Sequence, residues 1–223
     1  AFWIFLLCIT SCSEPRPLAT SQESTLNEIP VKYARGFQIF ETPEGIKVRL
    51  RDAGDTLKII DEYFFTNDSQ KEGIKVPINA ATLNSTTFVA FFDWLERVDL
   101  VKGLSYTESV MNKNMSVLIR AGQTLEITEG GEPAYELIVA LAPDIYMTYD
   151  IDEENTTRLE GAGIEVIKNL EYQEPHPLGR TEWIKLVGIL TGKFEESVKI
   201  FEEIESRYWE IRRKAGLSSY LPA

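Results

Sequence analysis

The chain has 223 residues, 43% of them hydrophobic, which is enough for one good core and predicts one domain or a domain with an appendage. Its net charge of −12 argues against a nucleic-acid binder, because such binding depends on a basic surface. The acidity serves solubility in the simplest interpretation, and the alternative is a preference for cationic ligands or partners. Two cysteines, Cys8 and Cys12, and one histidine, His176, exclude a disulfide framework in the globular body and a zinc site built from several histidines.

The N-terminus has the features of an export signal. Residues 1–9 form an uncharged apolar run, shorter than the ~20 residues that span a bilayer but long enough for the apolar core of a secretory signal. The run ends in Ile9-Thr10-Ser11-Cys12, which resembles the bacterial lipobox and implies that Cys12 is lipidated. The alternative is a buried strand with an incidental cysteine. We expect a partial lipoprotein signal over residues 1–11, which starts inside its reading frame because the initiator Met and basic start are absent.

A polar segment and three strands follow the signal. Residues 12–30 are rich in Ser, Thr, Pro and Glu and predict a flexible tether. Alternating or β-rich composition predicts strands over residues 37–40, 46–50 and 57–65, separated by Pro- and Gly-containing turns. These three strands are predicted to form an antiparallel meander at the edge of the domain.

Strand and helix patterns then alternate along the chain. We predict strands over residues 76–81, 100–104, 144–149 and 164–170, and helices over residues 86–98, 133–141 and 153–162. Such alternation implies parallel strand pairing with right-handed crossovers. In sheets of this kind, ligands bind beyond the carboxyl ends of the strands.

The last part of the chain is predicted to be helical. One helix is expected over residues 181–190, and apolar residues then recur at steps of three and four over residues 194–215. The second helix would be about 35 Å long. Because it would lack a partner, we expect Phe201, Tyr208 and Trp209 on it to be partly exposed.

No catalytic group can be assigned from the sequence. No glycine-rich phosphate loop or nucleophile elbow is present, and Asp152, Glu153 and Glu154 lie at a predicted helix start, where acids favour the dipole. His176 lies between two prolines and is interpreted as a linker residue. We therefore predict that the chain is not an enzyme and has no catalytic residue, no resident metal and no cofactor.

Several segments resemble one protein family. Residues 133–145 contain Glu136 and, further on, the sequence Ala-Leu-Ala-Pro-Asp. They resemble the signature of periplasmic binding proteins for cobalamin and ferric siderophores. Residues 79–106 and 161–167 are similar to two other strand–helix junctions of that family. Residues 177–183, Pro-Leu-Gly-Arg-Thr-Glu-Trp, are similar to a region of its Bacteroidetes-type subgroup. The resemblance covers about residues 31–216.

The resemblance implies an α/β fold: a three-layer αβα lobe with a mainly parallel central sheet, the N-terminal antiparallel meander and a long C-terminal backbone helix. It divides the chain into an N-terminal lobe over residues 31–178, linker helices over residues 179–216 and, over residues 217–223, the start of a remainder. The second lobe is expected to be missing. The subgroup usually has an Asp-Val-Gly-Tyr-like segment where this chain has residues 125–131, a departure that puts ligand contacts there in doubt.

The family role implied is that of a monomeric periplasmic lipoprotein, held at the membrane by its lipid anchor. It would deliver a ferric siderophore, cobalamin or haem to the permease of an ATP-binding-cassette importer. Two alternatives stay open from the sequence: a surface lipoprotein that acts as a partner-binding or sensory module, and a hydrolase completed by the missing half.

The resemblance and the predicted strand ends together suggest site residues. Glu136 occupies the position of a permease-docking glutamate, the alternative being a plain surface residue. Predicted ligand-binding residues lie after three strands: Thr82, Asn84, Ser85 and Thr86; Tyr106; and Thr148 and Tyr149. Ser85 or Thr86 could instead serve as helix N-caps, and the two tyrosines could instead pack in the core or at its rim.

Overall fold

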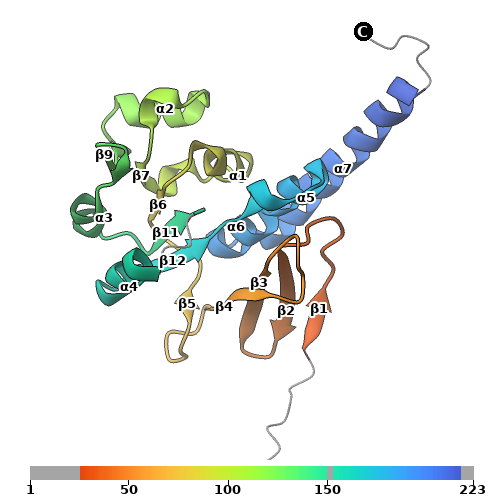
Figure 1. Ribbon diagram of the computed structural model, residues 1–223, viewed down its shortest axis with the longest axis horizontal. Coiled ribbons are helices and arrows are strands. Elements are labelled where there is room, and N and C mark those ends of the chain that lie inside the picture. The colour runs from red at the N-terminus through yellow and green to blue at the C-terminus, as the bar shows by residue number, and fades with distance from the viewer. Residues whose placement is uncertain (1–25, 150–152, 217–223) are drawn as a thin grey trace, which may run out of the picture.

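The computed structural model describes residues 26–149 and 153–216, and Figure 1 shows its ribbon. Residues 1–25, with the predicted signal, Cys12 and most of the predicted tether, lie outside the described residues, as do residues 217–223. The described part contains a parallel central sheet, a second sheet at its N-terminus and a long C-terminal helix. The predicted α/β fold class is confirmed.

The central sheet has five parallel strands in the order β12-β11-β6-β7-β8. Its strands are β6 (Ala81–Leu83), β7 (Val101–Leu104), β8 (Leu125–Glu126), β11 (Ile145–Thr148) and β12 (Glu165–Lys168). All four of the longer strands are buried along almost their whole length, as expected for a sheet covered on both faces.

Helices cover both faces of this sheet and make three layers. On one face, α3 (Tyr135–Leu141) and α4 (Glu153–Gly161) enclose a small core with Tyr146 and Val166 of the sheet. On the other face, α1 (Val89–Trp94) and α6 (Ile184–Thr191) share the main core with Ile145 and Met147. Consecutive residues of β11 therefore point to opposite cores, as the pleat requires.

The N-terminal sheet has the strand order β1-β2-β3-β4-β5 and is antiparallel from β1 to β4. Its strands are β1 (Asn27–Ile29), β2 (Phe37–Thr42), β3 (Gly45–Arg51), β4 (Ile59–Thr66) and β5 (Ile74–Lys75). The meander is confirmed, but β1 lies within residues 12–30, so the folded part begins earlier than expected. Phe37 packs on Trp183, with ring centroids 4.8 Å apart, and joins this sheet to the main core.

Two predicted elements differ from those observed. A strand was expected over residues 76–81, but the strand of this region, β6, begins only at Ala81. Residues 76–80 instead connect β5 to β6, and Ile78 there donates its backbone N–H to the Leu190 carbonyl of α6. The helix expected over residues 86–98 is a 3₁₀ turn, Thr86–Phe88, followed by α1. It ends early because Glu96 takes a left-handed conformation, with φ of 55°, which a helix does not allow.

The helical region after β12 is divided differently from the prediction. The helix expected over residues 181–190 is two helices, α5 (Pro177–Glu182) and α6, with Trp183 between them. The helix α2 (Lys113–Arg120), with Asn112 as its N-cap, and the small strand pair β9 (Thr128–Glu129) and β10 (Glu132–Pro133) had not been predicted. In α2 the spacing of Met115, Leu118 and Ile119 is helical but covers only two turns, and β9 and β10 have two residues each, so these short patterns were missed.

The long helix α7 (Phe194–Gly216) is confirmed, and Figure 1 shows its C-terminal half extending away from both sheets. Trp209 is 41% exposed and Tyr208 is half-buried, as expected. The expectation for Phe201 is wrong, because this side chain is fully buried. It packs against the Tyr33 ring and lies 4.9 Å from the Lys185 ammonium, which approaches its face.

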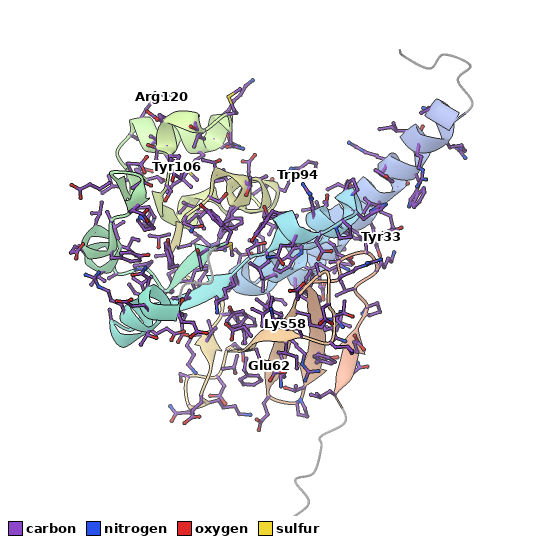
Figure 2. All side chains as sticks on the ribbon, viewed as in Figure 1. Tyr33, Lys58, Glu62, Trp94, Tyr106 and Arg120 are labelled. Atoms are coloured by element: carbon purple, nitrogen blue, oxygen red, sulfur yellow. The ribbon has the colours of Figure 1, made fainter. Side chains whose placement is uncertain are left out.

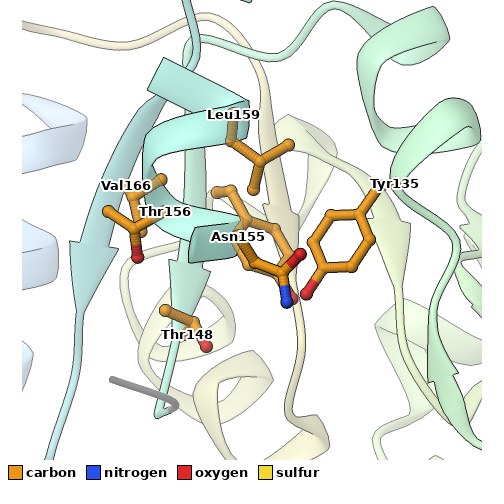
Figure 3. Close-up of a pocket in the computed structure, with 7 residues that line it drawn as sticks. Tyr135, Thr148, Asn155, Thr156, Leu159 and Val166 are labelled. Atoms are coloured by element: carbon orange, nitrogen blue, oxygen red, sulfur yellow. The ribbon is translucent and has the colours of Figure 1, made fainter. Parts of the chain in front are cut away.

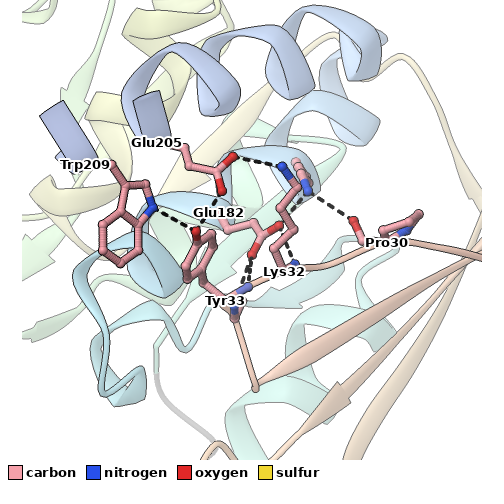
Figure 4. A network of polar contacts seen from close by, with 8 residues as sticks. Pro30, Lys32, Tyr33, Glu182, Glu205 and Trp209 are labelled. Carbon is pink, nitrogen blue, oxygen red and sulfur yellow. Dashed lines mark hydrogen bonds and ion pairs between the residues drawn. The ribbon is translucent and has the colours of Figure 1, made fainter. Parts of the chain in front are cut away.

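A buried carboxylate on α5 fixes the segment that enters the N-terminal sheet (Figure 4). Glu182 is fully buried, and its oxygens accept the backbone N–H groups of residues 32–34 at 2.7 to 3.0 Å. The Lys185 ammonium neutralises it at 2.6 Å and also donates to the Pro30 carbonyl. A desolvated charge is tolerated only when it is paired and hydrogen-bonded in this way.

Glu174, which precedes Glu182 in the chain, is a second buried carboxylate that accepts backbone N–H groups. It accepts the backbone N–H groups of Arg35 and Gly36 at 2.8 to 3.0 Å and the Trp183 indole N–H at 3.1 Å. Gly179 lies so close to Glu174 and to the Tyr33 carbonyl that a larger side chain would crowd them. The family-like segment over residues 177–183 therefore has a structural task, which is to bind the chain at residues 32–36.

The same segment is also joined to α7. The Tyr33 hydroxyl donates to Glu205 at 2.7 Å and accepts the Trp209 indole N–H at 3.0 Å, while Lys32 pairs with Glu205 at 2.8 Å (Figure 4). His176, interpreted from the sequence as a linker, caps α5 through its Nδ1 and stacks on the Tyr33 ring. The segment that leads into β2 and the middle of the long helix are thus held together.

We predict that Glu182→Ala strongly destabilises the fold. The change leaves the Lys185 ammonium buried without its carboxylate and leaves the amides of residues 32–34 without an acceptor, so the free energy of unfolding should fall by about 3–5 kcal/mol. Urea unfolding followed by circular dichroism measures this loss. Glu203→Ala, an exposed change on α7, is the control and should cost less than about 0.5 kcal/mol. Equal costs for the two variants would contradict the prediction.

Candidate functional site at the carboxyl edge of the central sheet

The strand order of the central sheet reverses between β6 and β11. From β6 the chain continues to β7 on one side, whereas from β11 it continues to β12 on the other side. The loops after β6 and β11 therefore leave in opposite directions at the carboxyl edge, which is the place where ligands of open α/β sheets usually bind. The loops that follow β7 and β12 begin at the same edge, because all these strands are parallel.

Two of the predicted ligand contacts join these loops instead of facing outward. Asn84 donates its side-chain amide to the Thr148 hydroxyl at 2.6 Å and accepts the Tyr149 backbone N–H at 3.3 Å. Asn84 is 6% exposed and Thr148 is 3% exposed. Their bonds cross the switch point between β6 and β11, so in this structure they join the ends of the two strands in one geometry.

Thr82 was expected after the first strand of the unit, but the structure places it inside β6. Its side chain is fully buried, and its hydroxyl lies 3.4 Å from the Ile145 carbonyl of the neighbouring strand. A direct contact between Thr82 and a ligand would require the sheet to open. The strand begins later than predicted because residues 76–80 form the connection between β5 and β6, which is hydrogen-bonded to α6.

The hydroxyl groups that follow Asn84 lie at the edge itself. Ser85 is the N-cap of the 3₁₀ turn, and its Oγ accepts the Thr87 backbone N–H and contacts the Thr87 hydroxyl. Thr86 is half-buried within the turn and does not cap it. The capping role that the sequence allowed for Ser85 is therefore observed, and Thr87 is the most exposed of the three.

Tyr106 follows β7 and is 42% exposed, in the loops near α2 and β9 (Figure 2). Its backbone is left-handed, with φ of 59°, and its hydroxyl donates to the Gly131 carbonyl at 3.2 Å. Glu126 accepts the backbone N–H groups of Tyr106 and Thr107 and so holds this strained loop. The chain departs from the family pattern over residues 125–131. This segment holds Tyr106 in place through Glu126 and the Gly131 carbonyl.

A second aromatic pair lies beside the switch point. Tyr149 follows β11 and is 44% exposed, and Tyr172 follows β12 and is 52% exposed. Their rings meet edge to face, with centroids 6.3 Å apart. Tyr172 had not been predicted as a site residue because it lies beyond the end of a strand whose length the sequence overestimated. Exposed aromatic rings of this kind offer faces on which a planar or bulky ligand can stack.

Glu171 is the other site residue that the sequence did not indicate. It is 9% exposed and accepts the Thr87 hydroxyl at 3.0 Å through Oε1, while Oε2 is buried with no hydrogen bond from the described residues. The backbone N–H groups of Tyr172 and of Glu171 itself also lie near the carboxylate and favour its charged form. Burial raises the pKa of Glu171, and the Thr87 hydrogen bond opposes that shift only in part.

A small cavity lies between α3, α4 and the end of β11, next to this edge (Figure 3). Tyr135 of α3 and Asn155 of α4 face each other across it, and Thr148, Leu159 and Val166 complete most of its wall. Its free volume is about 250 Å³, including the part open to solvent. Only about 10 Å³ of this space can hold a molecule the size of water, far below the usual size of ligand pockets, so a bulky ligand does not fit inside it.

Glu136 lies in the first turn of α3, with its side chain exposed, and is paired with Arg158 of α4. A hydrogen bond from its own backbone N–H and the Arg158 guanidinium hold the pKa of Glu136 below its usual value. The predicted docking residue is thus a charged surface group whose partner comes from the same chain.

Two kinds of feature were searched for in the described ranges, clusters of metal-binding side chains and membrane-spanning helices. Among residues 26–149 and 153–216, no three His, Cys, Asp or Glu side chains come together as a group able to hold a metal ion. Within the same ranges, no helix combines the length and apolarity needed to cross a bilayer.

Two curated proteins resemble the sequence, both named as lipoproteins of Methanocaldococcus jannaschii. Uncharacterized lipoprotein MJ0872 is 27% identical over 219 residues, and uncharacterized lipoprotein MJ0878 is 25% identical over 150 residues. The matches cover 87% and 63% of this chain but only 54% and 36% of those proteins. The chain therefore spans about half or less of the length of these relatives. No protein-family model matches the sequence.

Solved structures resemble the fold. Petrobactin-binding protein YclQ from Bacillus subtilis matches with a TM-score of 0.54 and 12% identity, over 76% of this chain and 54% of that chain. Siderophore-binding protein BauB, solved with acinetobactin and ferric iron, matches with a TM-score of 0.52 and 14% identity, over 64% of this chain and 50% of that chain. These matches show that the described fold is shared with about half of each of those two chains.

We predict a pH-dependent effect of Glu171→Gln on stability. Because the pKa of Glu171 is raised on folding, its contribution to stability is fully present below the ordinary glutamate pKa and is lost as the pH rises through the raised value. Glutamine cannot ionise, so the variant should have a higher Tm than the natural chain at about pH 7, and the difference should shrink at about pH 3.5. Thermal unfolding measures both, with Glu203→Gln as the control. A Tm difference that is the same at the two pH values would contradict the assignment.

Proposed function

We propose that this chain is the ligand-binding lobe of an extracytoplasmic solute-binding protein that delivers a metal complex, with a ferric siderophore as the leading candidate, to an ATP-binding-cassette importer. The observation that carries the proposal is the switch-point edge. There, a rigid floor made by Asn84 and Thr148 is bordered by the exposed rings of Tyr106, Tyr149 and Tyr172. The likeness to the fold of siderophore-binding proteins supports the same function.

Binding without covalent chemistry is consistent with this edge. It offers hydroxyl groups, aromatic faces and one buried acid, and these groups can hold a ligand by stacking and hydrogen bonding. A pocket closed on all sides is not needed if a second lobe covers the ligand. The lengths of the relatives support a longer protein, because the chain spans about half or less of each.

Attachment to the membrane is the second part of the proposal. The lipobox-like sequence ending at Cys12 supports diacylation there, and two acyl chains suffice for stable anchoring. The names of both curated relatives include the word lipoprotein. The Cys12→Ala chain should accordingly move from the membrane fraction to the soluble fraction after cell lysis.

The proposed ligand-binding role predicts a measurable affinity. The complete natural chain that contains residues 1–223 should bind at least one ferric siderophore, with haem and cobalamin as the other ligands to test, in isothermal titration calorimetry. Tyr149→Ala should weaken binding about tenfold, because a stacked ring contributes on the order of 1 kcal/mol or more. Trp94→Ala, which removes an aromatic ring from the exposed side of α1, is the control. The proposal fails if none of these ligands binds.

Delivery requires a docking point, and we propose Glu136 for it. An exposed carboxylate can orient a membrane partner through an arginine, because interfacial charge pairs steer association. Arg158 of the same chain holds Glu136 in the free protein and would have to release it on docking. Glu136→Ala should reduce ligand uptake by cells while leaving the affinity of the purified protein for ligand unchanged. An unchanged rate of uptake would remove Glu136 from the proposal.

A further inference from the structure

Four segments of the chain have the sequence Asn-X-Ser or Asn-X-Thr. They begin at Asn67, Asn84, Asn114 and Asn155, and none has proline in the middle position. This sequence is the acceptor for N-linked glycosylation in exported proteins. A glycan is bulky and hydrophilic, so the asparagine that carries one must lie on the surface of the folded chain with room around its side chain. The structure can therefore separate the four candidates.

Three of the four asparagines are poorly placed for this modification. Asn84 is 6% exposed, and its side chain makes the hydrogen bonds that join the ends of β6 and β11. Asn155 is half-buried and faces Tyr135 across the small cavity (Figure 3). Asn114 is exposed but lies in the first turn of α2 and donates its Nδ2 group to Asp93 at 2.7 Å. A sugar on Nδ2 would break the contacts of the first and third asparagines and would crowd the cavity at the second.

Asn67 has a different environment. It lies in the loop that connects β4 to β5 and is exposed, as are the three residues that follow it. Among the described residues, neither its side-chain amide nor the Ser69 hydroxyl is engaged in a hydrogen bond. The loop is held by Asp68, whose backbone N–H donates to the Thr66 hydroxyl at 3.1 Å and whose carboxylate accepts the Gln70 backbone N–H at 2.9 Å. The acceptor amide and the hydroxyl of this sequence are therefore both accessible on an ordered loop.

The loop lies away from the carboxyl edge of the central sheet. Residues 73–75, where the loop ends and β5 follows, line a groove together with Asp144 and Glu165, which lie at the starts of β11 and β12. In a parallel sheet the starts of the strands form the edge opposite to their ends. Figure 1 shows the loop before β5 at the lower end of the molecule and α1 and α2 at its upper end. A glycan on Asn67 would therefore leave the proposed ligand edge uncovered.

We infer that Asn67 is an N-glycosylation site and that the Ser69 hydroxyl is the second element of its recognition. The inference rests on the export of the chain in the proposed function and adds a covalent modification on the opposite side of the lobe. The sugar donor is an oligosaccharide carried on a lipid phosphate. The Asn67 Nδ2 forms a bond to the anomeric carbon of the sugar, the bond between that carbon and the phosphate oxygen breaks, the phosphate leaves with the lipid, and the amide loses one proton.

Peptide mass spectrometry tests the inference, because trypsin separates the four candidates. Cleavage after lysine and arginine places Asn67 in residues 59–71, Asn84 in residues 76–97, Asn114 in residues 114–120 and Asn155 in residues 121–158. The complete natural chain that contains residues 1–223 is expressed with its own signal in the organism that encodes it and is purified from the membrane fraction. We expect a glycan on the peptide of residues 59–71 and none on the other three.

Because Asn67 and Ser69 are exposed, substitutions there should leave the fold intact. Asn67→Gln and Ser69→Ala should each lose the whole glycan, whereas Ser69→Thr, which keeps a hydroxyl, should retain it. Asn114→Gln is the matched control and should also retain it. An exported chain with residues 59–71 unmodified, or a glycan that persists in Ser69→Ala, would overturn the inference and leave the proposed function standing. A chain that stays unmodified in the cytoplasm would overturn both the inference and the export on which it rests.

Discussion

Buried carboxylates that accept backbone N–H groups are the interaction on which the rest of this structure depends. Glu182 and Glu174 bind the chain at residues 32–36, and Lys185 neutralises the first of them. Because a charge in the interior is stable only with its full set of partners, the segment has one position that satisfies both acids. Through that position the N-terminal sheet, α5, α6 and the first half of α7 become one rigid body.

Because these elements are held together, the exposed carboxyl edge of the central sheet has a defined geometry. The central sheet shares its main core with α6 and the N-terminal sheet, so the carboxyl ends of its strands cannot shift independently. Asn84 and Thr148 then fix the two loops at the switch point. Ligand groups would therefore meet rings and hydroxyls already in place, and a preformed site loses less entropy on binding than one that must be ordered.

The same construction separates two tasks along the chain. Residues 177–183, whose sequence carries the most specific of the resemblances, hold the framework through Glu182 and Trp183. The edge residues come from short loops with little sequence pattern, which leaves them free to differ in ligand preference while the framework stays the same. Glu171 belongs to such a loop, since it follows β12 by only three residues and its contact with Thr87 joins the loop after β12 to the loop after β6.

The sequence by itself determined the fold class, the parallel strands over residues 100–104 and 144–149, the N-terminal meander and the long helix α7, because each depends on a local period of apolar residues. It also indicated the edge at which Tyr106 and Tyr149 lie. Only the tertiary structure decided that residues 76–80 form a connection, that Phe201 is covered and that Glu182 and Glu171 are buried. Those outcomes depend on contacts between residues far apart in the chain, such as Lys32 with Glu182 and Thr87 with Glu171, which no local period encodes.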